Sequence, residues 1–354
     1  MSKQTISLIE NLSERLKRHP KRVVFPEGDD PRILQAARQF ATRKLGVPIL
    51  LGERSKLKDH AQKLDINLDG LTLLEPSRSD DLDEFKKKFT GLRRFRGLDD
   101  REIDDYLQER NYYASMMLAT GHADAIVAGA TLRASSALRP LFQIIPFQED
   151  ISTASSMLIM ETPDKRYGID GTLFLADCGV IPDPTDKQLA DISMTTALLA
   201  SHLTNARAKV ALLSYTTKSR RTALPVSTKM KSATAIAQGK FARHGIDADV
   251  DGEMQVDAAL DPHVAEQKHI SGSVAGKANI LIFPDLSSGN NAAKMVQILG
   301  GARTYGQIIT GLKKPAAEIS RGASAHDIFG AAVVVAAQSV DKDYLYAIDS
   351  DSFE

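Results

Sequence analysis

The segment from Ile319 to Val340, ISRGASAHDIFGAAVVVAAQSV, has the residue types and spacing of an anion-binding site. Ser324 and Asp327 have the spacing of a capping box in front of a long apolar helix, and Ser320 and Arg321 lie just before it. A helix N-terminus presents unpaired N–H groups and a partial positive charge, which favour a bound phosphate. Arg321 would add a planar, two-pronged cation. The alternative is purely structural, with Ser324 and Asp327 capping the helix and Arg321 solvated.

Two other arginines are candidate anion contacts. Arg139 comes directly before Pro140 and is interpreted as lying at a turn. Arg93 belongs to the basic stretch LRRFR at residues 92–96. Such residues usually mark a solvated face, but a ligand that carries several phosphates needs a basic cluster of this kind.

Polar residues also follow two apolar segments in the second half of the chain. Asn290 and Lys294 come after FPDLSSG and suit a polar ligand contact at a strand end, although either also suits a helix start. Cys178 follows TLFLAD, where a thiol nucleophile is conceivable. No helix start or basic neighbour is visible to lower its pKa, so we interpret Cys178 as a buried, inert thiol.

Composition and missing motifs exclude several classes of function. The 45 Lys and Arg balance the 45 Asp and Glu, so no overall field holds a nucleic acid or a membrane surface. The single cysteine excludes an internal disulfide and a Cys-based zinc cluster. GxxxxGK[ST], GxGxxG, HExxH and GxSxG motifs are absent. Without an apolar run of about 20 residues or a signal-peptide core, we expect a cytoplasmic protein.

Short runs of Val, Ile and Leu predict the elements that must position these residues. Most runs are separated by stretches of helical period, which indicates a mainly parallel α/β sheet. Asp30 followed by Pro31 predicts a helix start, and Thr185 with Gln188 predicts a capping box. At 354 residues the chain is long enough for two domains. The predicted strands lie at residues 23–25, 47–51, 125–128, 155–160, 172–176, 210–215, 279–283 and 307–310.

Ligands of open α/β sheets gather beyond the carboxyl ends of the strands. The segments that follow those ends, and that we expect to carry the chemistry, are PEGDDPR, GATLRASSALRP, DCGVIPDP, YTTKSRR, PDLSSGNNAAK and GLKKPAAEISRG.

Taken together and in order, these segments resemble the phosphate acetyl/butyryl transferase family. The resemblance rests on VVFPEGDDPR, HADAIVAGA with the following LRP, FLADCGVIPDPTDKQLADI, VALLSY, DGEMQVDAAL, NILIFPDLSSGN with Lys294, and GLKKPAAEISRGASAHDI. It extends from about Arg22 to about Val340. No single piece is diagnostic, whereas the ordered set is specific.

The resemblance implies an architecture and a reaction. It implies two α/β domains around a cleft, related to the isocitrate and isopropylmalate dehydrogenase fold. Residues 1–145 and 311–354 would form the first domain, and residues 146–310 an inserted second domain. The implied activity is reversible acetyl transfer between coenzyme A and inorganic phosphate, with acetyl-CoA, phosphate and acetyl phosphate as substrates. No cofactor, metal ion, nucleic acid or membrane is implied, and the implied assembly is a homodimer.

The resemblance also implies roles for individual residues. The family's Ser-Arg pair matches Ser320 and Arg321, and its catalytic aspartate matches Asp327. Its two other arginines match Arg139 and, in competition with Arg94, Arg93. Asp327 would take the proton of the coenzyme A thiol, and Ser320 and Arg321 would hold the phosphoryl oxygens. A carboxylate at a helix start is ordinarily a weak base for a thiol, whose pKa is about 8.5, although a bound phosphate would make it more basic.

One segment departs from the family pattern, and alternative functions remain open. After VALLSY the family tends to have small residues, whereas this chain has the basic segment from Thr217 to Arg221. The alternatives are a butyryl or propionyl transferase and a catalytically silent acetyl-CoA sensor. A metal-dependent hydroxyacid dehydrogenase of the related fold would need a carboxylate cluster and a nicotinamide site, which the sequence does not display.

Overall fold

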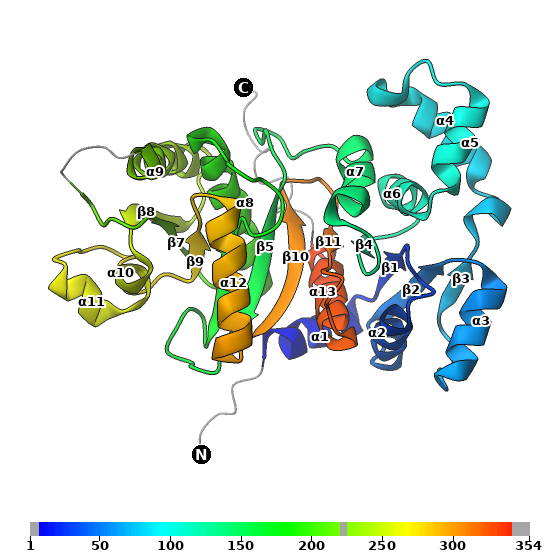
Figure 1. Cartoon of the computed structure of the whole chain (residues 1–354), viewed down its shortest axis with the longest axis horizontal. Helices are drawn as coiled ribbons and strands as arrows, with labels where there is room; N and C mark the ends of the chain where they lie inside the picture. Colours follow the sequence, from blue (N-terminus) through cyan, green and yellow to red (C-terminus); the bar gives the residue numbers. More distant parts are fainter. Residues whose placement is uncertain (1–6, 220–224, 342–354) are drawn as a thin grey trace. The chain divides into compact units, whose positions relative to one another are not determined.

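The computed structural model describes residues 7–219 and 225–341, with the Arg93 side chain left out, and these residues form two compact units (Figure 1). Unit 1 contains Phe147–Gly311. Unit 2 contains Ile9–Pro146 together with residues 312–341, so two distant stretches of the chain build it. Each unit has its own set of paired strands.

Unit 2 is built on a parallel sheet with the strand order β3-β2-β1-β4-β11. The last strand comes from the C-terminal stretch and pairs with β4, with Glu318 opposite Ala128. The carboxyl ends of β1, β4 and β11 therefore lie at one edge of the sheet. The strands are β1 (Lys21–Phe25), β2 (Gly46–Leu51), β3 (Thr72–Leu74), β4 (Ala125–Ala128) and β11 (Ala316–Glu318).

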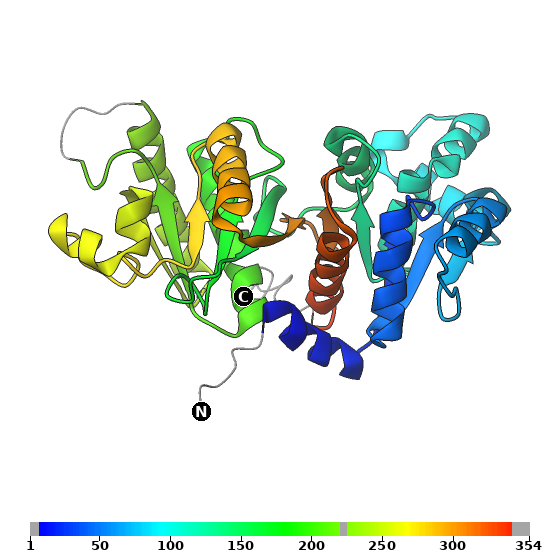
Figure 2. The same ribbon diagram turned by 60° about the horizontal axis from the view of Figure 1, so that its bottom comes forward.

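Helices cover both faces of the unit 2 sheet. On one face α13 (Ala325–Gln338) packs against α2 (Pro31–Thr42) and against β1, β4 and β11 (Figures 1 and 2). Its residues 328–338 are all buried, as expected for a helix that is apolar all round. On the other face α6 packs against β4 and α7 against β11. The remaining helices are α1 (Leu8–Arg18), α3 (Arg54–Lys63), α4 (Leu82–Gly91), α5 (Asp100–Gln108), α6 (Arg110–Thr120) and α7 (Ala134–Ile144).

Unit 1 is built on a mixed sheet with the order β10-β5-β6-β9-β7-β8. The pairs β10–β5 and β5–β6 are antiparallel, whereas β6, β9, β7 and β8 run parallel. The strands are β5 (Ser155–Glu161), β6 (Thr172–Ala176), β7 (Ala208–Leu213), β8 (Ala248–Met254), β9 (Ile280–Ile282) and β10 (Arg303–Thr310).

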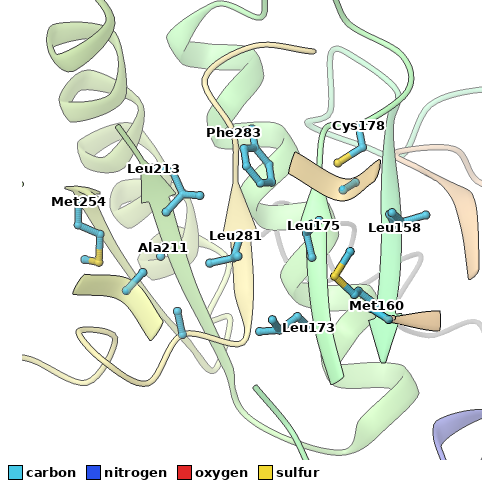
Figure 3. Close-up of a cluster of buried hydrophobic side chains, with 14 of the residues drawn as sticks. Leu158, Met160, Leu173, Leu175, Cys178, Ala211, Leu213, Met254, Leu281 and Phe283 are labelled. Atoms are coloured by element: carbon cyan, nitrogen blue, oxygen red, sulfur yellow. The ribbon is translucent and has the colours of Figure 1, made fainter. Parts of the chain in front are cut away.

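Alternate residues of the unit 1 strands point to opposite faces. On one face Leu158, Leu175 and Leu281 gather in a cluster that includes Ala293 of α12 (Leu286–Gly300), as Figure 3 shows for the labelled strand residues. The other face packs against α8 (Asp186–Thr204) and α9 (Pro225–Arg243). Two short helices, α10 (Val256–Leu260) and α11 (Pro262–Gln267), follow β8.

All eight strands predicted from the sequence are present, and both predicted helix starts are confirmed. Asp30 accepts a hydrogen bond from the Arg32 amide, and Thr185 and Gln188 form a capping box. The placement of Arg139 at a turn is wrong, because Pro140 lies inside α7. Proline costs that helix one backbone bond, but Pro140 is buried among apolar neighbours and its fixed φ angle suits a helix.

Candidate active site

Arg32, on the first turn of α2, joins the three loops that follow β1, β4 and β11. Its Nη1 donates to the backbone oxygens of Arg321, at 2.6 Å, and of Ala323, at 3.0 Å. Its Nη2 donates to the backbone oxygen of Ala130 at 2.8 Å, and its Nε and Nη2 also bond the Asp30 carboxylate. Although burial opposes it, hydrogen bonding from Arg32 holds the pKa of Asp30 below its ordinary value. One guanidinium thus fixes the backbone on either side of Gly322.

The loop after β11 presents Ser320 and Arg321 to solvent. Both side chains are exposed, and the Ser320 hydroxyl accepts a hydrogen bond from the Gly322 amide at 3.3 Å. Among the described residues, none forms a hydrogen bond or an ion pair with the Arg321 guanidinium. A backbone held in place by Arg32 therefore carries an unpaired planar cation, which is what recognition of a phosphate requires.

Asp327 lies in the first turn of α13 and forms the predicted capping box with Ser324. Its Oδ2 accepts from the backbone amide of Ser324 at 2.8 Å and from the Ser324 hydroxyl at 2.9 Å, while the Asp327 amide donates back to that hydroxyl at 3.2 Å. No described residue donates to Oδ1. The carboxylate is thus oriented through one oxygen, and the other oxygen is left to accept a proton.

Glu318 and Glu27 form a second, buried pair of carboxylates next to this loop. Glu318 is the last residue of β11 and is 8% exposed, and Glu27 follows β1 and is 5% exposed. The Gly129 amide donates to both oxygens of Glu27, at 3.0 and 3.1 Å. A Cβ atom on Gly129 would lie 3.0 Å from Oε1 of Glu318 and 2.6 Å from the Ile319 oxygen, so only glycine fits between them. Both carboxylates therefore flank Gly129.

The surroundings of Glu318 favour its protonated form. No described residue donates a hydrogen bond to its carboxylate, in contrast to Glu27. Burial, reinforced by the negative charge of Glu27, raises the pKa of Glu318 to about 7. Burial also raises the pKa of Glu27, against hydrogen bonds from the backbone of Gly129 and Thr131. Since two close carboxylates do not readily ionise together, Glu318 takes up a proton as the pH falls through about 7.

This proton predicts a pH dependence of stability. Because the folded-state pKa of Glu318 is about 7 against an ordinary value of 4.5, the folded protein binds a proton that the unfolded chain has lost between these values. The free energy of unfolding contributed by Glu318 should therefore fall by about 3 kcal/mol as pH rises from 4.5 through 7. Urea unfolding of the wild type and of Glu318→Gln at pH 4.5 and at pH 7 measures this fall in the free energy of unfolding. The variant should lack the part of the fall that Glu318 contributes. Parallel curves for the two proteins would contradict the buried proton.

The two other candidate arginines also lie in unit 2. Arg139 is exposed on α7, and its positive charge opposes the burial that raises the pKa of the Tyr112 hydroxyl on α6. Arg93 begins the short helix η2 (Arg93–Phe95), and its side chain lies outside the described residues. Among the described side chains, no hydrogen bond or ion pair joins Arg139 to the loop that carries Arg321.

Asn290 and Lys294 lie on α12 of unit 1, one helical turn apart and so on the same face of the helix. The helix begins before both residues, at Leu286 after the N-cap Asp285, so Gly289 lies in its first turn and not in a turn before it. A Cβ atom at Gly289 would come within 2.4 Å of the Asp177 oxygen, so glycine lets the helix approach the segment after β6. The Asn290 amide donates to the Cys178 oxygen at 3.0 Å, and Lys294 is exposed.

Cys178 is buried, as the sequence predicted. Its side chain is fully buried in the unit 1 cluster (Figure 3), and burial raises the pKa of its thiol. The neighbouring Asp177 carboxylate orders the same segment by accepting from the Ser156 hydroxyl and from the amides of Gly179 and Ile181. A buried thiol with a raised pKa is a poor nucleophile, which favours a structural role for Cys178.

We expect Cys178→Ala to keep nearly full turnover and to lose about 1 kcal/mol of stability, because the change removes one buried sulfur atom. Steady-state kinetics and denaturant unfolding of the purified variant check this. A folded variant without activity would instead indicate a covalent acyl-enzyme on Cys178.

The basic segment after β7 is held by acidic groups of unit 1 where it is described. The Lys218 ammonium contacts the Asp251 carboxylate and donates to the Gly252 oxygen at 2.7 Å. The Ser219 amide donates to Oε1 of the buried Glu253 at 3.1 Å. Lys218 is therefore neutralised by its own unit. Arg220 and Arg221 lie outside the described residues.

Two structural tests bear on the class of the protein. Within residues 7–219 and 225–341, no group of three or more His, Cys, Asp or Glu side chains is arranged to hold a metal ion. In the same part of the chain no helix has both the length and the apolar character needed to cross a bilayer.

Sequence reasoning missed three residues of this site: Arg32, Glu27 and Glu318. For Arg32 and Glu27 the signal was the segment PEGDDPR, which follows a predicted strand. Such a segment indicates a ligand site but does not show which of its side chains point into that site. For Glu318 the signal was a single carboxylate between Ala317 and Ile319, two residues that the structure buries.

Comparison with known proteins identifies a family. Residues 7–336 match the family model described as phosphate acetyl/butaryl transferase. The phosphate acetyltransferase of Acetivibrio thermocellus is 36% identical over 94% of this chain and 98% of its own length, and that of Treponema pallidum is 36% identical over 94% and 99%.

Solved structures give the same family and a wider fold relationship. A phosphotransacetylase from Streptococcus pyogenes superposes with a TM-score of 0.85 at 35% identity, covering 94% of this chain and 98% of that one. A putative 4-hydroxythreonine-4-phosphate dehydrogenase from Salmonella typhimurium matches over 90% of this chain and 99% of its own with a TM-score of 0.51 at 11% identity, which shows the dehydrogenase-like fold alone. The chain belongs to the phosphate acetyl/butyryl transferase family.

Proposed function

We propose that this protein is a phosphate acetyltransferase, which catalyses the reversible conversion of acetyl-CoA and phosphate into acetyl phosphate and coenzyme A. The observation that carries the proposal is the exposed Ser320–Arg321 pair, held by Arg32 in front of Asp327 at the start of α13. Similarity to phosphate acetyltransferases over 94% of the chain supports the same activity.

In this reaction Arg321, Ser320 and Asp327 of unit 2 have separate roles. Arg321 and the Ser320 hydroxyl hold the phosphoryl oxygens and stabilise the charge that develops at the acyl carbonyl. Oδ1 of Asp327 accepts the thiol proton, since Oδ2 is engaged by Ser324. The thiolate sulfur attacks the acetyl carbon, the bond from that carbon to the phosphate oxygen breaks, and the proton ends on phosphate. The transfer is direct, so no acyl-enzyme forms.

The proposal extends to the substrate contacts of the remaining candidates. Arg93, Arg139, Asn290 and Lys294 would bind coenzyme A or phosphate. Exposure supports this for Arg139 and Lys294, whereas one hydrogen of the Asn290 amide is already used by the Cys178 oxygen. In this proposal the active site lies in a cleft between the two domains.

We further propose a cytoplasmic homodimer that uses no separate cofactor or metal ion, with coenzyme A as a substrate. Exposed apolar residues on α12 support an interface between two copies, because such a cluster is unusual on a surface that faces only water. They are Met295 at 60%, Val296 at 40%, Ile298 at 76% and Leu299 at 78% exposure.

Incubation of the purified protein with phosphate and a series of acyl-CoAs, with release of free thiol as the readout, tests the proposed function. Acetyl-CoA should react fastest. Faster release of thiol from butyryl-CoA or propionyl-CoA would show that the enzyme prefers a longer acyl group. Binding of acetyl-CoA without release would indicate a silent sensor.

A further inference from the structure

Two peptide units of the loop after β11 bond Arg32 through their carbonyl oxygens. One unit joins Arg321 to Gly322 and the other joins Ala323 to Ser324, and their oxygens lie 2.6 and 3.0 Å from Nη1. Neither unit is a cis peptide bond. In a trans unit the N–H group points away from the carbonyl oxygen, so both N–H groups lie on the side opposite the guanidinium.

Each of these N–H groups bonds a side chain that has a proposed role in the reaction. The Gly322 amide donates to the Ser320 hydroxyl at 3.3 Å, and the Ser324 amide donates to Oδ2 of Asp327 at 2.8 Å. Because the Ser320 oxygen accepts from an amide, its own hydrogen stays available for a phosphoryl oxygen. The bond to Oδ2 likewise leaves Oδ1 of Asp327 for the thiol proton. One peptide unit therefore connects each side chain to Arg32.

The Arg32 guanidinium is itself fixed in one orientation. Its Nε donates to Oδ1 of Asp30 at 3.0 Å and its Nη2 to Oδ2 at 2.8 Å, and the Asp30 side chain is only 9% exposed. Nη2 also donates to the Ala130 oxygen at 2.8 Å. A charged donor makes a stronger hydrogen bond than a neutral one and polarises the peptide unit that it bonds. The N–H group at the far end of each unit thus becomes a better donor.

Resting on the proposed acetyl transfer, we propose that Arg32 is a positioning residue for the reaction. Through the two peptide units it directs the Ser320 hydroxyl and the Asp327 carboxylate, while Asp30 keeps the guanidinium in place. Arg32 touches no reacting atom in this proposal. When Arg32 is removed, the released peptide units can rotate, which moves both side chains and turns carbonyl oxygens toward the anionic phosphate. A displacement of catalytic groups by about 1 Å is enough to slow a reaction about 10²-fold.

The turnover number with saturating coenzyme A and acetyl phosphate tests this role. Arg32→Ala should be about 10²-fold slower than the wild type, with the Michaelis constant for coenzyme A within a few-fold. Arg32→Lys should recover part of the rate, because an ammonium group does not bond all of the Arg32 partners at once. Asp30→Asn keeps a residue that caps α2 but loses the charge that holds Arg32, so its turnover number should fall about tenfold.

Arg38 on the same helix provides a matched control. Its Nη1 also donates to two backbone oxygens of one loop, those of Asn67 at 2.9 Å and Asp69 at 2.7 Å. Because Arg32→Ala and Arg38→Ala remove the same kind of contact, their melting temperatures should fall by similar amounts. Only Arg32→Ala should lose turnover. Guanidinium chloride at millimolar concentration should restore part of that turnover, whereas sodium chloride should not.

A double-mutant cycle tests whether Arg32 acts through Asp327. Two independent residues that each contribute about 10²-fold would together account for about 10⁴-fold. If Arg32 directs the carboxylate, its removal has less effect once Asp327→Asn has removed that carboxylate. The double variant should therefore be slower than the wild type by no more than about 10³-fold.

Three kinetic results would overturn the inference. They are a folded Arg32→Ala enzyme with wild-type turnover, equal losses of turnover in Arg32→Ala and Arg38→Ala, and fully multiplicative losses in the cycle. If Arg32→Ala does not fold, Arg32→Lys and Asp30→Asn carry the same comparison.

A measurement without catalysis separates this inference from the proposed function. Amide hydrogen exchange of residues 320–327, followed by mass spectrometry, should be faster in Arg32→Ala than in the wild type and unchanged in Arg38→Ala. Equal exchange in all three proteins would contradict the positioning role. A wild type that forms no acetyl-CoA, together with faster exchange in Arg32→Ala, would remove the proposed function and leave the effect of Arg32 on the loop.

Discussion

Asp327→Asn is expected to lower the turnover number by about 10²-fold or more while both Michaelis constants stay within a few-fold. Asparagine keeps an oxygen that can accept from the Ser324 amide and hydroxyl, so the capping geometry survives. What disappears is the only oxygen able to take a proton, Oδ1 of the carboxylate. A loss of turnover without a loss of binding is the signature of a group that acts on the proton.

A second capping box in the same unit provides the matched control. Asp99 and Glu102 at the start of α5 repeat the geometry of Ser324 and Asp327, with Glu102 at the corresponding third position. Glu102→Gln should therefore change the melting temperature only slightly, because it neutralises a carboxylate that caps a helix. Its turnover number should stay unchanged. If Asp327→Asn behaves like Glu102→Gln, Asp327 only caps α13 and leaves the set of proposed catalytic residues.

Arg321→Ala should affect binding and catalysis together. Its guanidinium would hold phosphate in the ground state and also stabilise charge in the transition state. We expect the Michaelis constant for phosphate or acetyl phosphate to rise about tenfold or more, and kcat/KM to fall by about 10² to 10³. Lysine at the same position should recover only part of the loss, because a single ammonium does not repeat the two-pronged contact.

Stability should hardly change in Arg321→Ala, because no described residue bonds the guanidinium and its backbone is held by Arg32. Arg18→Ala, at an exposed arginine on α1 without a proposed role, is the control for losing one positive charge. Equal kinetics for the two variants at several salt concentrations would place Arg321 among solvated surface residues.

The sequence predicted those parts of the fold that have a strong local signal. Strands rich in Val, Ile and Leu were all located, and so were helix starts marked by Asp30 and by Thr185 with Gln188. The missed strands lack that signal: β3 is three residues long, β8 reads ADVDGEM, and β11 reads AAE. Pairing with neighbouring strands holds β3, β8 and β11 in the sheet. The local sequence of a strand does not show which distant strand it pairs with.

The candidate site divides in the same way. Ser320, Arg321 and Asp327 are close in sequence, so a capping motif and a family resemblance suffice to propose them. Arg32, Glu27 and Glu318 matter because β1, β4 and β11 place their carboxyl ends together, and this is a property of strand order. The roles of Arg93, Arg139, Asn290 and Lys294, and the domain bounds built on the resemblance, stay predictions.

The most direct test of the central claim is a reaction of the purified protein with acetyl phosphate and coenzyme A, followed by the absorbance of the thioester. Acetyl-CoA should form with matching release of phosphate, and addition of phosphate to the products should reverse the reaction. Labelled acetyl groups should never remain on the protein after denaturation. Release of phosphate without a thioester, or a protein that binds acetyl-CoA and exchanges nothing, would contradict the account.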